Sequence, residues 1–151
     1  MKDYKSLCHT RWDCKYHVVF IPKRRKKKIY GLLRKHLGEI FHELAHQKES
    51  SVEEGHLHQD HVHMCISVPP KFAVSHVVGF LKGKSAISIA RNLTGRKRNF
   101  SGENFWARGY FVSTVGLDEE VVRQYIRAQE KEEDRLEQLS MDWSRPPSGG
   151  S

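Results

Sequence analysis

The segment from His61 to Val68 alternates polar and apolar residues at every position and then ends at Pro69-Pro70. A period of two is typical of a β-strand with one buried face, because successive side chains point to opposite sides of a sheet. The apolar set that would face the core is Val62, Met64, Ile66 and Val68. The polar set on the opposite side is His61, His63, Cys65 and Ser67. The pattern therefore predicts a sheet with helices on one face and an open, polar second face.

Further strand and helix patterns surround this segment in a regular order. The expected strands are 11–21, 51–57, 61–68 and 105–115, and the expected helices are 31–47, about 75–93 and about 118–139. The first strand would bury Trp12, Cys14, Tyr16, Val18 and Phe20 and expose Asp13, Lys15 and His17. Only a short turn separates the second and third strands, which predicts a hairpin. The order β-α-β-β-α-β-α predicts an α+β fold, a ferredoxin-like (split βαβ) antiparallel sheet with two helices on one face and an added C-terminal helix.

The chain length and cysteine pattern fit a single domain without disulfide bonds. The 151 residues predict a single domain over 1–143, and the Pro/Gly/Ser-rich stretch 144–151 is expected to be a disordered tail. Its three cysteines are odd in number and lack C-x-x-C spacing, which excludes a disulfide framework and favours a cytoplasmic location. We expect neither a membrane span nor a secretory signal, because the sequence lacks a long apolar run and an apolar N-terminal region.

Positive charge is concentrated in two stretches of this chain, whose formal net charge is +8. Residues 1–36 contain twelve Lys and Arg against two acidic residues, and 71–108 contain eight against one, whereas 118–142 contain four against nine. Such segregation predicts a basic face and a polyanionic partner. The candidate residues for contacts with such a partner are Lys23, Arg24, Arg25, Lys26, Lys82, Lys84, Arg96, Lys97, Arg98 and Arg108.

Two histidines on the open face of the third strand are candidate metal ligands. His61 and His63 lie two residues apart, so both imidazoles would point the same way and could bind one ion. The alternative is a pair of polar residues on a solvated face, and His56-Leu57-His58 is a competing pair. Asp60 could orient the His61 ring as a second-shell carboxylate, or it could be an ordinary turn residue. Imidazole ligands by themselves would favour zinc.

The last helix brings a phenol and an amide onto one face. Tyr125 and Gln129 lie four residues apart, which makes them neighbours on an α-helix. Tyr125 could simply pack at the edge of the stripe formed by Val121, Val122 and Ile126. Tyrosine is also a covalent nucleophile, and a metal ion on the same phosphate would stabilise the charge that develops during attack.

Several short motifs, in order along the chain, resemble one enzyme family. They are His9–Trp12 with Cys14–His17, Asp60–Met64 followed by Ser67–Pro70, Leu81–Ser85, Phe105–Tyr110, and Tyr125-Ile126 with Gln129. Together they resemble the small single-tyrosine HUH transposases of bacterial insertion sequences, the IS200-like group. The resemblance covers about residues 5–140.

This resemblance implies a chemistry and a set of roles. His61, His63 and Gln129 match the residues that hold a divalent ion in the family, Mg²⁺ or Mn²⁺. Tyr125 matches the nucleophile that attacks single-stranded DNA, leaving a 5′-phosphotyrosine link and a free 3′-hydroxyl. The family also implies recognition of DNA hairpins at the element ends and a homodimer in which the tyrosine helix can act in trans.

Two other functions are compatible with parts of this pattern. One is a domesticated relative that processes repetitive palindromes without mobilising itself, which shares the catalytic motifs. The other is a non-catalytic module that binds single-stranded nucleic acid, because a ferredoxin-like sheet also serves in RNA recognition. Such modules stack bases on aromatic residues, whereas the strand 61–68 offers histidines on its open face.

Overall fold

The computed structural model describes residues 5–7, 10–23, 29, 31–93, 105–114 and 118–144. Its strands are β1 (Lys5–Leu7), β2 (Thr10–Trp12), β3 (Lys15–Phe20), β4 (Ser51–Leu57), β5 (Val62–Ser67) and β6 (Phe111–Ser113). Its helices are α1 (Gly31–Gln47), α2 (Val74–Leu93) and α3 (Glu119–Ser144). β1 and β2 form a separate two-stranded sheet. Arg24, Arg25, Lys26, Arg96, Lys97, Arg98 and the predicted tail from 145 onward lie outside the described residues.

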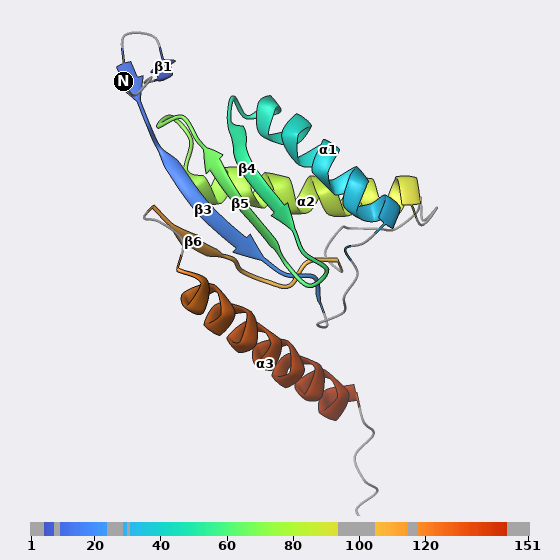
Figure 1. Ribbon diagram of the computed structural model, residues 1–151. Helices are drawn as coiled ribbons and strands as arrows, with labels where there is room; N and C mark the ends of the chain where they lie inside the picture. Colours follow the sequence, from blue (N-terminus) through green and yellow to red (C-terminus); the bar gives the residue numbers. More distant parts are fainter. Residues whose placement is uncertain are drawn as a thin grey trace, which may run out of the picture.

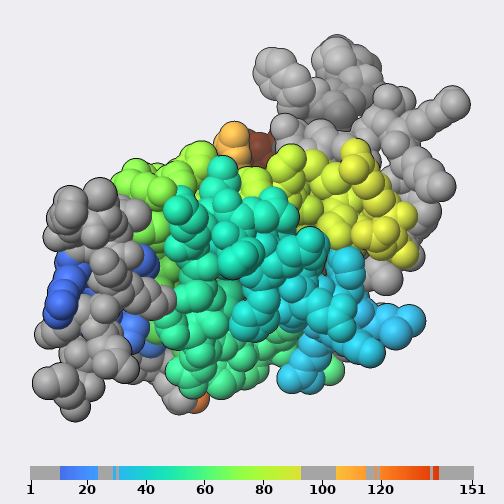
Figure 2. Space-filling view, turned by 90° about the horizontal axis from the view of Figure 1, so that it is seen from above, coloured from blue at the N-terminus to red at the C-terminus, as the bar shows by residue number. Residues whose placement is uncertain are grey.

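The main sheet has the predicted ferredoxin-like arrangement. Its strand order is β4-β5-β3-β6, and every hydrogen-bonded pair is antiparallel. Figure 1 shows α1 and α2 together on one side of the sheet and α3 apart from them, beside β6. Seen from above in Figure 2, α1 and α2 lie side by side across the surface. The α+β fold predicted from the sequence is therefore confirmed.

The core lies between the sheet and the layer formed by α1 and α2. Val62, Met64 and Ile66 of β5 are buried there, as their alternation predicts, together with Leu37 and Phe41 of α1. The ring of Phe20 meets those of Phe41 and Trp106 edge to face, at centroid distances of 5.9 and 4.7 Å. Such edge-to-face contacts stabilise aromatic clusters beyond the burial of their area.

The first expected strand is interrupted, and its burial differs from the pattern, since Trp12, Cys14 and Tyr16 are only partly buried. The stretch 11–21 divides into β2 and β3 around Asp13-Cys14. In β3, Val18 and Phe20 are buried as expected, but Val19 and the following Ile21 are buried as well. Successive residues of a strand point to opposite faces, so this unbroken run of buried residues shows that the chain is covered on both faces of the sheet from Val18 to Ile21.

The expected strand 105–115 is the largest correction. Within the described part of this stretch, residues 105–114, only Phe111–Ser113 forms a strand. Trp106 makes an isolated bridge to Pro22, and Gly109 has a φ of +82°. The left-handed conformation at Gly109 breaks the regular pleat that a strand requires. The last helix also differs from its prediction, since it runs past Leu139 to Ser144.

Candidate functional site

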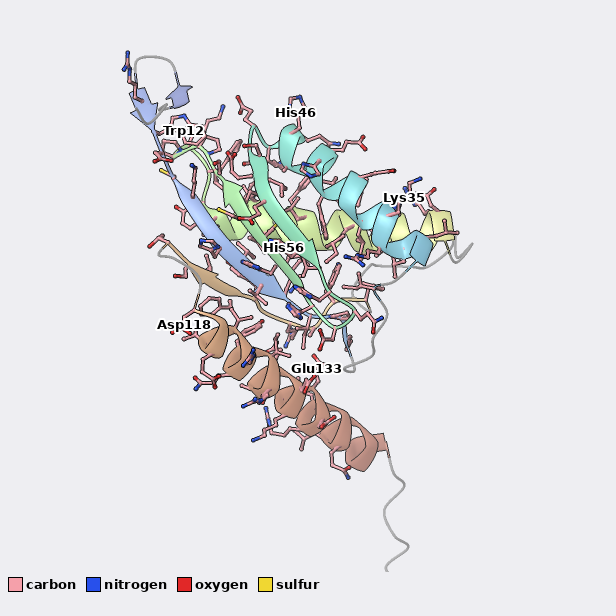
Figure 3. The ribbon with its side chains drawn as sticks, viewed as in Figure 1. Trp12, Lys35, His46, His56, Asp118 and Glu133 are labelled. Atoms are coloured by element: carbon pink, nitrogen blue, oxygen red, sulfur yellow. The ribbon has the colours of Figure 1, made fainter. Side chains whose placement is uncertain are left out.

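A cavity of about 480 Å³ lies between the open face of the sheet and α3. Its lining consists of His17, Glu54, His56, His58, His61, His63, Val122, Arg123 and Ile126. Figure 3 shows His56 on the sheet and Glu133 on the side of α3 that faces the sheet. The cavity therefore collects five imidazoles from β3, β4 and β5 and their connecting turn.

The predicted histidine pair lies in this cavity. His63 is opposite His56 in the antiparallel register of β4 and β5, and their rings stack with centroids 5.6 Å apart. His61 and His58 stack at 4.2 Å across the turn of the same hairpin. The two H-x-H pairs, which the sequence presents as competitors, are thus side by side in one wall.

Asp60 orients His61. Oδ1 of Asp60 accepts a hydrogen bond from Nδ1 of His61 at 2.8 Å. A carboxylate oxygen only accepts, so Nδ1 is the nitrogen that carries a proton, and Nε2 is the nitrogen through which His61 could bind a cation. A carboxylate that holds the second nitrogen of an imidazole is typical of metal-binding histidines, because it fixes the ring and raises its basicity.

Burial favours the neutral form of His63. Desolvation, followed by the nearby rings of His17 and His56, lowers the pKa of His63 below its usual value of 6.5. Desolvation and His61 lower the pKa of His58 in the same direction. Neutral imidazoles carry the lone pair that a metal ion needs, so the chemistry of this wall fits cation binding near pH 7.

The sequence pattern does not identify His17 as part of this group. Its Nδ1 lies 3.4 Å from Nε2 of His63, and the two rings stack at 5.7 Å. In the sequence, His17 is one polar residue of a separate strand, and only the pairing of β3 with β5 brings it to the wall. Among the described residues, no three His, Cys, Asp or Glu side chains converge as a ready metal-binding group.

Tyr125 faces β6 rather than the histidine cavity. Its ring packs against Phe111 at a centroid distance of 5.9 Å, and its hydroxyl is buried without a hydrogen-bond partner among the described residues. Burial raises the pKa of Tyr125 to about 12. The residues of α3 that line the cavity are Val122, Arg123 and Ile126, and Ile126 lies about one turn before Gln129.

Gln129 is held by the chain preceding β6. Its Nε2 donates to the carbonyl oxygen of Arg108, and the Cα of Gly109 lies close enough that an added Cβ would be 3.6 Å from the same nitrogen. Tyr125 and Gln129 therefore share a helix face, as their spacing predicts, and the structure places that face against residues 108–111. It does not bring either side chain into contact with the histidine pair.

The predicted DNA contacts fall in different places. Lys84 and Arg108 are exposed, and the backbone N–H of Lys23 donates to the carbonyl of Phe105 at 2.7 Å. Lys82 makes contacts within the chain, because its ammonium donates to the carbonyls of Ala107 and Gly109 at 2.8 and 2.7 Å.

No helix among the described residues is long and apolar enough to cross a membrane.

Comparison with known proteins gives a consistent answer. Residues 10–129 match the family described as "Transposase IS200 like". The transposase for insertion sequence element IS200 of Salmonella typhimurium strain LT2 is 41% identical over 150 residues, which covers 99% of both chains. The ISDra2 transposase TnpA of Deinococcus radiodurans is 28% identical over 123 residues, covering 81% of this chain and 88% of the relative.

Solved structures share the fold. A crystal structure described as a transposase from Deinococcus radiodurans R1 superposes with a TM-score of 0.73 at 25% identity, covering 83% of this chain and 97% of that one. The structure of a REP-associated tyrosine transposase bound to a REP hairpin has a TM-score of 0.53 at 11% identity, covering 83% and 68%. The family match spans most of the sequence, and the IS200 relative aligns along nearly its whole length. The chain therefore belongs to the IS200-like transposases, enzymes that cleave DNA and transfer its strands.

Proposed function

We propose that this transposase cleaves and rejoins single-stranded DNA at insertion-sequence ends through a 5′-phosphotyrosine intermediate on Tyr125. The observation that carries the proposal is the histidine cavity, in which His63 of β5 and His61 just before β5 lie under the helix that bears the tyrosine. A phosphate bound there would be close to the imidazoles of His61 and His63 and to Arg123.

His61 and His63 would hold the divalent cation, Mg²⁺ or Mn²⁺, with Gln129 as a third ligand. Asp60 supports this role through its hydrogen bond to His61. When bound, such an ion supplies Lewis-acid stabilisation of the phosphate charge. The amide oxygen of Gln129 suits a hard cation, whereas imidazoles tolerate several divalent metals.

The phenol must change its surroundings before it can react. A buried hydroxyl with a pKa of about 12 stays protonated at neutral pH, and a neutral phenol is a weak nucleophile. We infer that the Tyr125 side chain leaves its contact with Phe111, within one subunit or with α3 exchanged in a homodimer, and reaches the cavity while Gln129 keeps its contact with the Arg108 carbonyl. The phenolic oxygen then attacks phosphorus while the bond to O3′ breaks, so O3′ leaves with the electron pair and takes a proton. A second 3′-hydroxyl reverses the step and rejoins the strands without an external energy source.

Hairpin ends are the proposed substrate. The structural neighbour with a REP hairpin is a tyrosine transposase, and this chain has a comparable sheet together with exposed Arg108 and Lys84. Phosphate contacts from such cations supply affinity, whereas the histidine cavity supplies the reaction.

A denaturing gel tests the nucleophile. Labelled single-stranded DNA that carries a hairpin is incubated with Mn²⁺ and the native protein, Tyr125→Phe or Tyr110→Phe. The native protein and Tyr110→Phe are expected to form a covalent adduct, and Tyr125→Phe to form none while it still binds the hairpin. An adduct that persists in Tyr125→Phe rejects the assignment, and hairpin binding without any adduct in the native protein favours a non-catalytic module.

The histidine pairs provide a second arm of the same assay. His61→Ala and His63→Ala are expected to abolish cleavage and to leave hairpin binding within about two-fold, because phosphate-contacting cations supply affinity. His56→Ala and His58→Ala are expected to do much less. If His56→Ala and His58→Ala abolished cleavage and the other two variants did not, His56 and His58 would be the metal ligands instead.

A further inference from the structure

Residues 106–109 lie between α2 and α3 and are held by hydrogen bonds on several sides. Nε1 of Trp106 donates to Oγ of Ser85 at 3.0 Å, and the backbone N–H of Ala107 donates to the carbonyl of Ile21 at 2.9 Å. These contacts fix the start of the segment against the core. The strongest remaining contact is made by Lys82, whose role the predicted function does not explain.

Lys82 holds two carbonyls with one ammonium group. Its Nζ donates to the carbonyl oxygens of Ala107 and Gly109 at 2.8 and 2.7 Å, and it lies 5.8 Å from the ring centroid of Phe20. A partly buried ammonium is unfavourable unless its donors are satisfied, so these bonds anchor the side chain as well as the segment. Burial lowers the pKa of Lys82 to about 8, and the charge of Glu133 on α3 opposes that shift.

The carbonyl between these two points the other way, toward α3. The Arg108 carbonyl accepts the amide N–H of Gln129. Lys82 and Gln129 therefore grip three consecutive carbonyls from opposite sides. Gly109, the last residue of the three, has a φ of +82°.

The grip decides which end of the Gln129 amide is available. A carbonyl oxygen can only accept, so it binds the NH₂ end of the side chain and leaves Oε1 as the atom that can reach a ligand. Oxygen is the donor that Mg²⁺ and Mn²⁺ prefer. A displaced Arg108 carbonyl would release the amide to rotate.

We propose that Lys82 is a positioning residue for the metal site, which acts through the carbonyls of Ala107 and Gly109 to fix the Arg108 carbonyl and, through it, the Gln129 amide. The inference rests on the proposed function, because it assigns Gln129 the role of metal ligand. It replaces the expectation that Lys82 contacts DNA.

The test compares Lys82→Met with Arg91→Met, an exposed cation on the same helix. Three quantities are measured for each variant: the Mn²⁺ concentration for half-maximal single-turnover cleavage, the hairpin Kd, and Tm. Loss of a residue that orients a ligand typically lowers metal affinity or activity by about 10-fold to 100-fold. We expect that increase in the half-saturating Mn²⁺ for Lys82→Met, with an unchanged hairpin Kd, and recovery of part of the loss in Lys82→Arg. Arg91→Met is expected to match the native protein.

Two results overturn the inference. A weaker hairpin Kd with a smaller salt dependence in Lys82→Met would make Lys82 a DNA contact. A lower Tm with unchanged Mn²⁺ dependence would make its role structural only. If the native protein shows no metal-dependent cleavage, the proposed function fails, and hydrogen exchange then decides the coupling. Faster exchange at 107–110 and around Gln129 in Lys82→Met, but not in Arg91→Met, supports the grip, and equal exchange rejects it.

Discussion

At the scale of single residues, the buried hydroxyl of Tyr125 is the most unusual feature. A buried polar atom without a partner costs free energy in the folded state, and the same burial keeps the phenol protonated. Stability and chemistry therefore make opposite demands on this side chain. The structure satisfies packing, since the ring lies against Phe111, and leaves the oxygen unused.

Tyr125→Phe is expected to unfold at equal or higher denaturant concentration than the native protein at pH 8. Removal of an unsatisfied buried hydroxyl relieves a cost of about 1 kcal/mol. The folded phenol has a pKa of about 12 and the unfolded phenol one of about 10, so the folded state binds more protons between these values. Its contribution to stability is therefore complete below pH 10 and is lost as the pH rises toward 12.

Unfolding curves in urea at pH 8, 10 and 11 check this prediction. The difference in unfolding free energy between Tyr125→Phe and the native protein is expected to widen above pH 10. The pKa of Lys82 is lowered to about 8, so its titration raises the unfolding free energy as the pH rises from about 8 to 10.5. This contribution is the same in both proteins and cancels in their difference. A constant difference across the three pH values would show that the phenol is hydrated in the folded state.

At the scale of elements, hydrophobic periodicity predicts most helices and strands, and the differences from the prediction arise from tertiary contacts. The stripe at 31–47 predicts α1 within its observed bounds, and the alternation at 61–68 predicts which face of β5 is buried. The aromatic-rich stretch 105–115 predicts a longer strand than β6. A local pattern cannot show that Lys82 and Ser85 of α2 form hydrogen bonds with residues 106–109. Spacing alone likewise shows that Tyr125 and Gln129 share a face without showing what that face meets.

The two glycines Gly109 and Gly83 offer a matched test of these elements. Gly109→Ala places a side chain at a φ of +82°, which costs an L-residue about 1–2 kcal/mol. Gly83 lies in α2, where an added Cβ meets nothing within 4 Å, so Gly83→Ala is expected to stabilise the protein by up to about 1 kcal/mol. Urea unfolding of both variants measures these opposite signs. Equal effects would show that segment 106–109 does not depend on the left-handed turn.

At the scale of the whole molecule, the proposed catalytic cavity and the proposed DNA-contacting cations lie in different parts of the chain. The histidine cavity is lined by the sheet and α3, whereas exposed Lys84 lies on α2 and Arg108 lies before β6. We therefore expect substrate affinity and cleavage to be separable by mutation.

Hairpin binding is expected to weaken steeply with salt. Each neutralised phosphate contributes a slope of about −0.7 to the logarithm of affinity against the logarithm of salt on single strands. Fluorescence anisotropy at several salt concentrations measures this slope for a hairpin strand and for the matching linear strand. The hairpin is expected to bind more tightly at each concentration. An affinity that does not change with ionic strength would show that the basic residues do not contact phosphates in the complex.

The protein is also expected to form a homodimer. The edge strand β6 is three residues long, and Val112 on it and Leu139 on α3 are exposed apolar side chains. Such residues are common at subunit contacts, and exchange of α3 between subunits would use the same helix. Sedimentation velocity at micromolar concentration gives the answer. A single monomeric species over that range would contradict the dimer and would mean that Tyr125 acts at the cavity of its own chain.

The wall of five imidazoles has a practical consequence for handling the protein. Nitrogen ligands bind Ni²⁺, Cu²⁺ and Zn²⁺ more tightly than Mn²⁺, and His17, His56, His58, His61 and His63 share one accessible cavity. The untagged chain is therefore expected to be retained on immobilised nickel and to elute with imidazole. Trace transition metals carried through such a column would occupy the histidines ahead of Mg²⁺. The protein therefore needs a chelator wash before the assay, so that the measured metal preference is not set by ions carried over from purification.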